Sequence, residues 1–248
     1  MSGKNIVVTG AGQGIGRAYA HSAAKHGAQV FVTDINMTAC KKVVSEIMEA
    51  GGRAEALELD VAEIDSCRNA AESVSGVAPV IHGLINNAAI FSNIRVKPFW
   101  DIEVAEWDRL MNVNLRGPFV MVKTFLELLR HHEGASIVNV SSDSFKLGRT
   151  GYLHYTASKA GIVGLTSSMA RELGQFNIRV NAISPGPVYT EIKRDTVSPE
   201  QKKALHEAQS IARDAGPDDM VGLVVFLLSD LSRFITGQTI SVNGGLVF

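Results

Sequence analysis

The chain has 248 residues, 46% of them hydrophobic, and its 24 Lys and Arg side chains nearly balance 25 Asp and Glu. This length and composition allow one domain with a large core, and the interspersed charges, without a basic tract, argue against a nucleic-acid partner. The apolar run at 221–228 is much shorter than the roughly 20 residues of a membrane span. Because no apolar signal sequence precedes the first predicted strand, we expect a cytoplasmic protein.

Short β-branched runs alternate with segments of helical periodicity along the chain. The predicted strands are 5–9, 29–33, 55–59, 83–86, 136–140, 178–183 and 239–242. The predicted helices cover about 15–26, 38–50, 65–75, 103–130, 155–174 and 217–229. This alternation predicts one α/β domain over 1–248, a doubly wound three-layer sandwich with a seven-stranded, mostly parallel sheet. The charged stretch at about 187–216 is expected to be a substrate loop or lid.

A glycine-rich turn joins the first predicted strand to the first predicted helix. Glycines at positions 10, 12, 14 and 16 fit the spacing G-x-x-x-G-x-G. Positions without side chains let backbone N–H groups and the N-terminus of a helix approach a pyrophosphate. An ordinary tight turn is the alternative, but the strand before it and the helix after it favour a dinucleotide site.

An acidic residue, Asp34, follows the second predicted strand. An acid at this position accepts hydrogen bonds from the adenosine ribose hydroxyls and repels a 2′-phosphate. Gln13 and Ile35 supply no cation for such a phosphate, although Arg17 lies one turn into the helix. The pattern predicts NAD rather than NADP as cofactor, and a plain turn acid is the alternative.

Tyr155 and Lys159 stand four positions apart in a predicted helix. Residues at this spacing share a helix face, so both heads can reach one cleft. A nearby ammonium favours the phenolate form and moves the pKa of the phenol from about 10 toward neutrality. The pair is therefore a candidate acid/base, with a surface Tyr/Lys pair as the alternative.

Several motifs together resemble the short-chain dehydrogenase/reductase family. They are T-G-x-x-x-G-I-G from Thr9 to Gly16, NNA at 86–88, NVN at 112–114, SS at 141–142, YTASK at 155–159, PGPVYT at 185–190 and ITGQTISVNGG at 235–245. The match spans essentially the whole chain in the family's order. Ala89 departs from it, because the family usually has glycine there, and its methyl group is expected to tighten the cofactor cleft. The resemblance implies a Rossmann-type, NAD(P)-dependent oxidoreductase.

The same resemblance implies the catalytic and cofactor-binding residues. Tyr155 is the implied acid/base beside Lys159, Ser142 holds the substrate oxygen, and Asn114 supports a water relay from the lysine to solvent. Asn86 is implied to lie by the adenosine ribose. The implied cofactor contacts, besides Tyr155 and Lys159, are Gly10, Gln13, Gly14, Ile15, Gly16, Asp34, Asp60, Val61, Asn86, Val113, Pro185, Gly186, Val188 and Thr190.

Side chains next to the catalytic positions are the candidates for substrate contacts. They are Phe91, Asn93, Arg95, Ser144, Phe145, Tyr152, His154 and Tyr189. Polar groups and bases outnumber large apolar groups here, which favours a polyol, sugar or hydroxy acid over a steroid. For Arg95, Lys97 and Lys193, a solvated surface position is the alternative. We therefore expect an NAD-dependent alcohol dehydrogenase or reductase, with a 3-oxoacyl thioester reductase and a non-catalytic NAD-sensing protein as alternatives.

Metal binding and assembly complete the expectations. Neither the two cysteines nor the seven histidines have the spacing of a metal site, so we expect no metal. Relatives in the resembled family usually associate through two long helices, here at about 103–130 and 155–174, and through the C-terminal segment. The resemblance therefore implies a homotetramer.

Overall fold

Seven strands form one sheet in the computed structural model, which describes residues 1–131, 134–192 and 198–248. The strands are β1 (Asn5–Thr9), β2 (Gln29–Asp34), β3 (Arg53–Glu58), β4 (Gly83–Asn86), β5 (Ser136–Val140), β6 (Arg179–Pro185) and β7 (Thr239–Val242). Their order is β3-β2-β1-β4-β5-β6-β7, and every neighbouring pair is parallel. The predicted doubly wound α/β fold with seven strands is confirmed.

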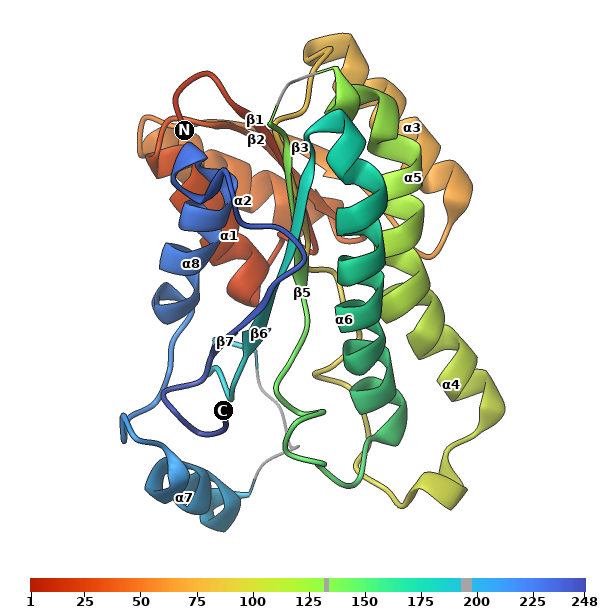
Figure 1. The fold of residues 1–248 in the computed structure, drawn as a ribbon, viewed down its shortest axis with the longest axis vertical. Helices are drawn as coiled ribbons and strands as arrows, with labels where there is room; N and C mark the ends of the chain where they lie inside the picture. Colours follow the sequence, from red (N-terminus) through yellow and green to blue (C-terminus); the bar gives the residue numbers. More distant parts are fainter. Residues whose placement is uncertain (132–133, 193–197) are drawn as a thin grey trace.

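Helices cover both faces of the sheet (Figure 1). On one face lie α1 (Gly14–Lys25), α2 (Met37–Glu49) and α8 (Asp218–Leu228), and on the other α3 (Ile64–Val77), α4 (Val104–Met111), α5 (Gly117–Arg130) and α6 (Leu153–Leu173). Along β1, Ile6 and Val8 join the core on the α1 side, whereas Val7 joins the core beneath α3 and α5. Both faces of the strands are thus buried, which explains their continuous apolar runs.

The predicted helix at about 103–130 is helical from Val104 to Arg130, but a π-helical turn interrupts its α-helical hydrogen bonding. A 3-10 turn at Phe99–Asp101 precedes α4, and a π-helical turn at Asn112–Arg116 separates α4 from α5. Pro118 has no backbone N–H, so the carbonyl of Asn114 lacks its usual helical donor. A wider turn accommodates that missing hydrogen bond. The interruption places Asn114 where the two helices meet.

The charged stretch at 187–216 contains a helix that the sequence patterns did not predict. This helix, α7 (Pro199–Ala208), begins at Ser198, whose side chain forms a reciprocal capping box with Gln201. Lys202 of α7 binds Asp214 at 2.6 Å, which ties the helix to the chain that follows it. In Figure 1, α7 lies at the carboxyl end of the sheet, away from the other helices.

No helix in the described ranges is long and apolar enough to cross a bilayer.

Candidate active site

A cavity of about 870 Å³ lies at the carboxyl ends of the strands. Its lining includes the loops that follow β1 to β6, together with residues of α4 and α6. β1 and β4 lie side by side at the centre of the sheet, where the order of the strands reverses. Open parallel sheets bind ligands in this crevice, and the volume is that of a small-molecule site.

The cavity brings together most of the residues that the sequence singled out. Those that line it are Gly10, Gln13, Gly14, Ile15, Gly16, Asp34, Asp60, Val61, Ala89, Phe91, Val113, Ser142, Ser144, Tyr152, Tyr155, Lys159, Pro185, Gly186, Val188 and Thr190. Those that lie elsewhere are Asn86, Asn93, Arg95, Asn114, Phe145, His154 and Tyr189. Lys193 is outside the described residues.

The glycine-rich turn forms one end of the cavity. Gly14 has a φ of 58°, in the left-handed region that favours glycine, and its N–H donates to Oε1 of Glu191 at 2.9 Å. A side chain at Gly16 would place its Cβ 2.2 Å from the carbonyl oxygen of Gly10. The N-terminus of α1 therefore exposes backbone N–H groups and already holds a carboxylate, so it fits a phosphate group.

Asp34 faces the same cavity from the end of β2. Its carboxylate oxygens accept hydrogen bonds from the backbone N–H groups of Gly12 at 3.1 Å and Asn36 at 3.0 Å. The nearby Arg17 pairs with Glu46 at 2.8 Å. Burial raises the pKa of Glu46, but side-chain hydrogen bonds outweigh it and hold that pKa below its ordinary value. Arg17 is therefore already neutralised by a carboxylate.

Tyr155 and Lys159 lie one turn apart on α6 and both line the cavity. The ammonium nitrogen of Lys159 is 5.9 Å from the centre of the Tyr155 ring and donates to the carbonyl of Val140 at 2.8 Å. The Tyr155 ring also packs on Phe91, with 4.6 Å between the ring centres. The pair therefore does share one cleft, as the helical spacing predicts.

Burial lowers the pKa of Lys159 from 10.5 to about 8. Below pH 8 the folded protein holds a buried ammonium that the unfolded chain solvates, so stability is lost there and returns as the pH rises toward 10.5. The difference between the two pKa values of Lys159 corresponds to about 3 kcal/mol in the free energy of unfolding.

We expect the free energy of unfolding of the wild type, minus that of Lys159→Met, to increase between pH 8 and pH 10.5. Groups common to both proteins cancel in this difference. Urea unfolding without cofactor at several pH values measures it, and Lys41→Met, which removes an exposed ammonium, is the matched control. A pH-independent difference for Lys159→Met would contradict the lowered pKa.

Ser142 is held by the turn that follows β5. Its Oγ accepts a hydrogen bond from the backbone N–H of Ser144 at 3.2 Å. The intervening Asp143 is fully buried, and its carboxylate accepts from Ser184 Oγ at 2.7 Å and Asn243 Nδ2 at 2.6 Å. Asp143 thus fastens the Ser142 turn to β6 and to the C-terminal segment, a role that no sequence motif marks.

Asn114 lies behind the cavity wall. Its Oδ1 accepts from the backbone N–H of Ile90 at 2.7 Å, and its Nδ2 donates to the Ile90 carbonyl at 3.1 Å and to Ser158 Oγ at 3.3 Å. These contacts join the α4–α5 junction to the loop after β4 and to α6. The implied part of Asn114 in a proton relay stays a prediction.

Asn86, expected beside the cofactor, does not line the cavity. Asn86 is buried, and its Nδ2 donates to Asn139 on β5 at 2.8 Å. Its neighbour Asn87 lines the cavity instead and donates through Nδ2 to the carbonyls of Thr9 and Gly10, both at 3.0 Å. Successive strand residues point in opposite directions, and the dipeptide alone does not reveal which one faces the ligand. Asn87 fastens the glycine-rich turn to the end of β4.

His154 also lies away from the cavity. It is fully buried next to Tyr155 in sequence, but neighbouring residues of a helix face different sides. Its Nε2 is 3.3 Å from a carboxylate oxygen of Glu106, which also binds Lys97 at 2.5 Å. Burial lowers the pKa of His154 despite this carboxylate. His154 therefore belongs to the contact between α4 and α6.

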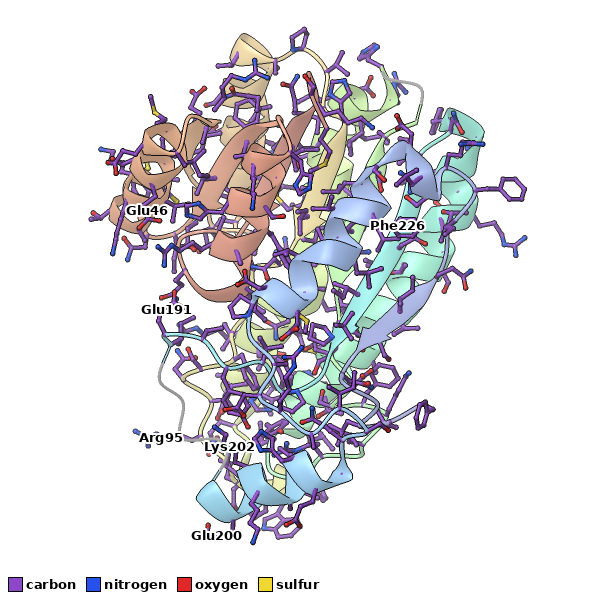
Figure 2. The ribbon with its side chains drawn as sticks, turned by 90° about the vertical axis from the view of Figure 1, so that its left-hand side faces the viewer. Glu46, Arg95, Glu191, Glu200, Lys202 and Phe226 are labelled. Carbon is purple, nitrogen blue, oxygen red and sulfur yellow. The ribbon has the colours of Figure 1, made fainter. Side chains whose placement is uncertain are left out.

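The remaining substrate candidates outside the cavity are corrected in the same way. Arg95 is exposed (Figure 2). Tyr189 packs under Lys202, whose ammonium is 4.3 Å from the centre of the ring. Phe145 lies in the turn after β5 but does not line the cavity. Arg149, which no motif marks, does line it. Within the described residues, no group of three or more His, Cys, Asp or Glu side chains is placed to hold a metal ion.

A doubly wound parallel sheet with a glycine-rich turn after β1 and an acid after β2 defines a dinucleotide-binding protein of the Rossmann type. A family model described as enoyl-(acyl carrier protein) reductase matches residues 10–247. The chain belongs to the short-chain dehydrogenase/reductase family, whose members are NAD(P)-binding oxidoreductases.

Relatives within this family carry different names. A 3-oxoacyl-[acyl-carrier-protein] reductase of Aquifex aeolicus is 34% identical over 99% of this chain and 98% of its own length. An L-rhamnose 1-dehydrogenase (NAD(P)(+)) of Sphingomonas sp. is 35% identical over 99% and 97%. A crystal structure described as a putative NAD(P)-dependent gluconate 5-dehydrogenase of Beutenbergia cavernae, with NADP bound at low occupancy, matches with a TM-score of 0.92 at 34% identity, over 99% of this chain and 97% of that one.

Proposed function

We propose that this protein is an NAD-dependent oxidoreductase that interconverts a secondary alcohol and its ketone, with a small polar substrate such as a polyol, sugar or hydroxy acid. One observation carries the proposal. Tyr155, Lys159 and Ser142 line the same cavity as the glycine-rich turn and Asp34. The proposed acid/base group and the proposed dinucleotide site therefore share one cavity.

The roles of the side chains follow from this placement. A nicotinamide cofactor bound in this cavity would supply the acceptor for the hydride of the carbinol carbon. Tyr155, as phenolate, takes the proton of the substrate hydroxyl, and the positive charge of Lys159 stabilises that phenolate. Ser142 donates a hydrogen bond to the substrate oxygen. Asn114, which is hydrogen-bonded to the backbone of Ile90, supports a water relay that carries the proton to solvent.

The cofactor would be held mainly by the loops after the first three strands. The glycine-rich turn, from Gly10 to Gly16, offers its backbone N–H groups to the pyrophosphate. Asp34 accepts from the ribose hydroxyls, and its charge together with the neutralised Arg17 disfavours a 2′-phosphate, which supports NAD. Because Glu191 occupies the N–H of Gly14, its carboxylate must move aside when the pyrophosphate binds.

Turnover of a panel of substrates tests the proposed reaction. We expect NADH to form when NAD and secondary alcohols, polyols, sugars or hydroxy acids are supplied. NADH fluorescence titration provides the independent measure of cofactor binding. The non-catalytic sensing role would be favoured if NADH bound but the protein neither oxidised any of these compounds nor reduced the matching ketones. Absence of NADH binding would reject the proposal altogether.

Reduction of a 3-oxoacyl thioester is the second candidate, because a relative with that name is 34% identical over nearly the full chain. An acyl thioester is long and its pantetheine arm needs an open groove, whereas the wall near Tyr155 carries the hydroxyls of Ser142 and Ser144 and the guanidinium of Arg149. A 3-oxoacyl pantetheine thioester that is reduced faster than any polar ketone would favour this candidate.

A homotetramer is the proposed assembly. Trp100 and Val104, at the start of the α4 region, expose 72% and 74% of their surface, and Phe248 at the C-terminus exposes 97%. Contiguous exposed apolar patches, unlike single apolar side chains, commonly mark subunit contacts. Analytical ultracentrifugation measures the assembly, and a monomer at micromolar concentration would contradict it.

A further inference from the structure

The turn after β5 brings hydroxyl groups and one guanidinium to the same wall of the cavity. Ser142, Ser144 and Arg149 line the cavity together with Tyr155. The turn is closed by backbone hydrogen bonds, among them one from the N–H of Arg149 to the carbonyl of Ser144 at 3.2 Å. Gly148, with a φ of 59°, lets the chain reverse within it. Arg149 is thereby held by the backbone of Ser144, which itself donates to Ser142, and all three residues line the cavity.

Arg149 has no acidic partner among the residues that the structure describes. Its guanidinium carbon lies 5.6 Å from the centre of the Tyr152 ring, which is itself buried and lines the cavity. Lys97 and Lys202, by contrast, are each bound to a carboxylate. A guanidinium packed on an aromatic ring still offers its in-plane N–H groups to a planar anion.

Ser144 supplies a second and independent sign of a ligand at this wall. It is 8% exposed, and its Oγ has no hydrogen-bond partner within the described part of the chain. An unpaired buried hydroxyl is unfavourable unless a ligand satisfies it. The neighbouring carboxylate of Asp143 is already bound by Ser184, Ser241 and Asn243, so it claims neither Ser144 nor Arg149.

Three of the five acidic residues that line the cavity lie away from this wall. Asp34, Asp60 and Glu63 follow β2 and β3, on the other side of the switch point from β5. Asp143 is already bound as described above, and Asp108 of α4 lines the cavity next to Arg109. The end of the cavity at β5, where Tyr155 and Ser142 lie, therefore has Arg149 as a cation besides Lys159. An anion bound there meets a cation and a free hydroxyl.

We propose that Arg149, together with Ser144, binds a carboxylate group of the substrate, so that the alcohol oxidised by this protein is a hydroxy acid. The inference rests on the proposed function and narrows it, because a neutral polyol or sugar would leave the guanidinium without a counter-charge. A planar carboxylate matches the two parallel N–H donors of an arginine. Arg149 then determines which alcohols are accepted, while Tyr155 and Ser142 act on the reacting hydroxyl.

Matched pairs of substrates test this site. Gluconate and sorbitol, glycerate and glycerol, and lactate and propylene glycol each differ by a carboxylate in place of a neutral group. We expect the wild type to prefer the acid in at least one pair. Arg149→Gln should raise the KM for that acid about 10- to 100-fold, as expected for loss of a charge-assisted hydrogen bond, with little change for the neutral partner. Arg149→Lys should retain part of the preference, and Ser144→Ala should weaken it less.

Controls separate a carboxylate site from a structural role. Arg171→Gln removes the charge of an exposed arginine on α6 and should leave the preference unchanged. NADH titration should give the same affinity for Arg149→Gln as for the wild type. The carboxylate site would be overturned if Arg149→Gln raised the KM equally for the acid and its neutral partner, or if the wild type oxidised only the neutral partners. Either result would leave the proposed reaction standing. If the protein bound NADH but oxidised neither these alcohols nor any others, both the carboxylate site and the proposed reaction would be overturned.

Discussion

Replacing Tyr155 with phenylalanine is expected to lower kcat about 10²–10⁴-fold, the usual contribution of a general acid/base. The change removes one oxygen atom and leaves the ring that packs on Phe91, 4.6 Å away between ring centres. The substrate hydroxyl then has no group to take its proton, whereas the glycine-rich turn and Asp34 are untouched. NADH affinity should therefore stay nearly the same.

Steady-state kinetics and NADH fluorescence titration on the same preparation measure the two quantities. Tyr152→Phe is a matched control, because it removes a phenol oxygen from the neighbouring ring in the same cavity. Its kcat is expected to fall much less. If Tyr155→Phe kept the wild-type kcat on the compound that the wild type turns over fastest, the proton would be leaving by another group and the mechanism would be wrong.

Replacing Asp34 with alanine is expected to reverse or remove a preference for NAD over NADP. Loss of hydrogen bonds from the ribose hydroxyls to a charged acceptor should raise the KM for NAD about 10- to 100-fold. Removal of the negative charge should at the same time lower the KM for NADP. The expected change in the ratio of kcat/KM between the cofactors is therefore larger than either single effect.

Asp34→Asn separates charge from hydrogen bonding. The amide oxygen can still accept from the backbone N–H of Gly12, which the carboxylate does at 3.1 Å. This variant should accept NADP better than the wild type while losing less affinity for NAD than the alanine variant. A wild type that already prefers NADP, or unchanged ratios in both variants, would reject the assignment of Asp34.

Arg17 is the cation to examine if NADP binds well, since it lies in the first turn after the glycine-rich loop. In the structure its guanidinium is paired with the carboxylate of Glu46 at 2.8 Å. The sequence patterns raised Arg17 as an uncertainty for cofactor choice, and they contained no reason to link it to a glutamate 29 positions away. Only the packing of α1 against α2 brings the two together.

Local patterns were sufficient for the elements and much of the site. Short β-branched runs predicted all seven strands, and four-residue spacing predicted that Tyr155 and Lys159 share a face. These signals are local, because a side chain's direction within one element depends only on backbone geometry. The helix α7 was missed because its ten residues carry a weak apolar pattern, and its capping box lies in a charged stretch.

The sequence by itself determined the α/β class, the glycine-rich turn, Asp34 after β2 and the Tyr155–Lys159 pair, because each depends on residues that are near one another in the chain. The tertiary structure alone decided that Asn87 and not Asn86 faces the cavity, that Glu191 reaches the N–H of Gly14, and that Arg149 and Ser144 line the same cavity. Such contacts depend on how strands pair and how loops meet across the sheet. That arrangement comes from the packing of the whole core, which no short motif contains.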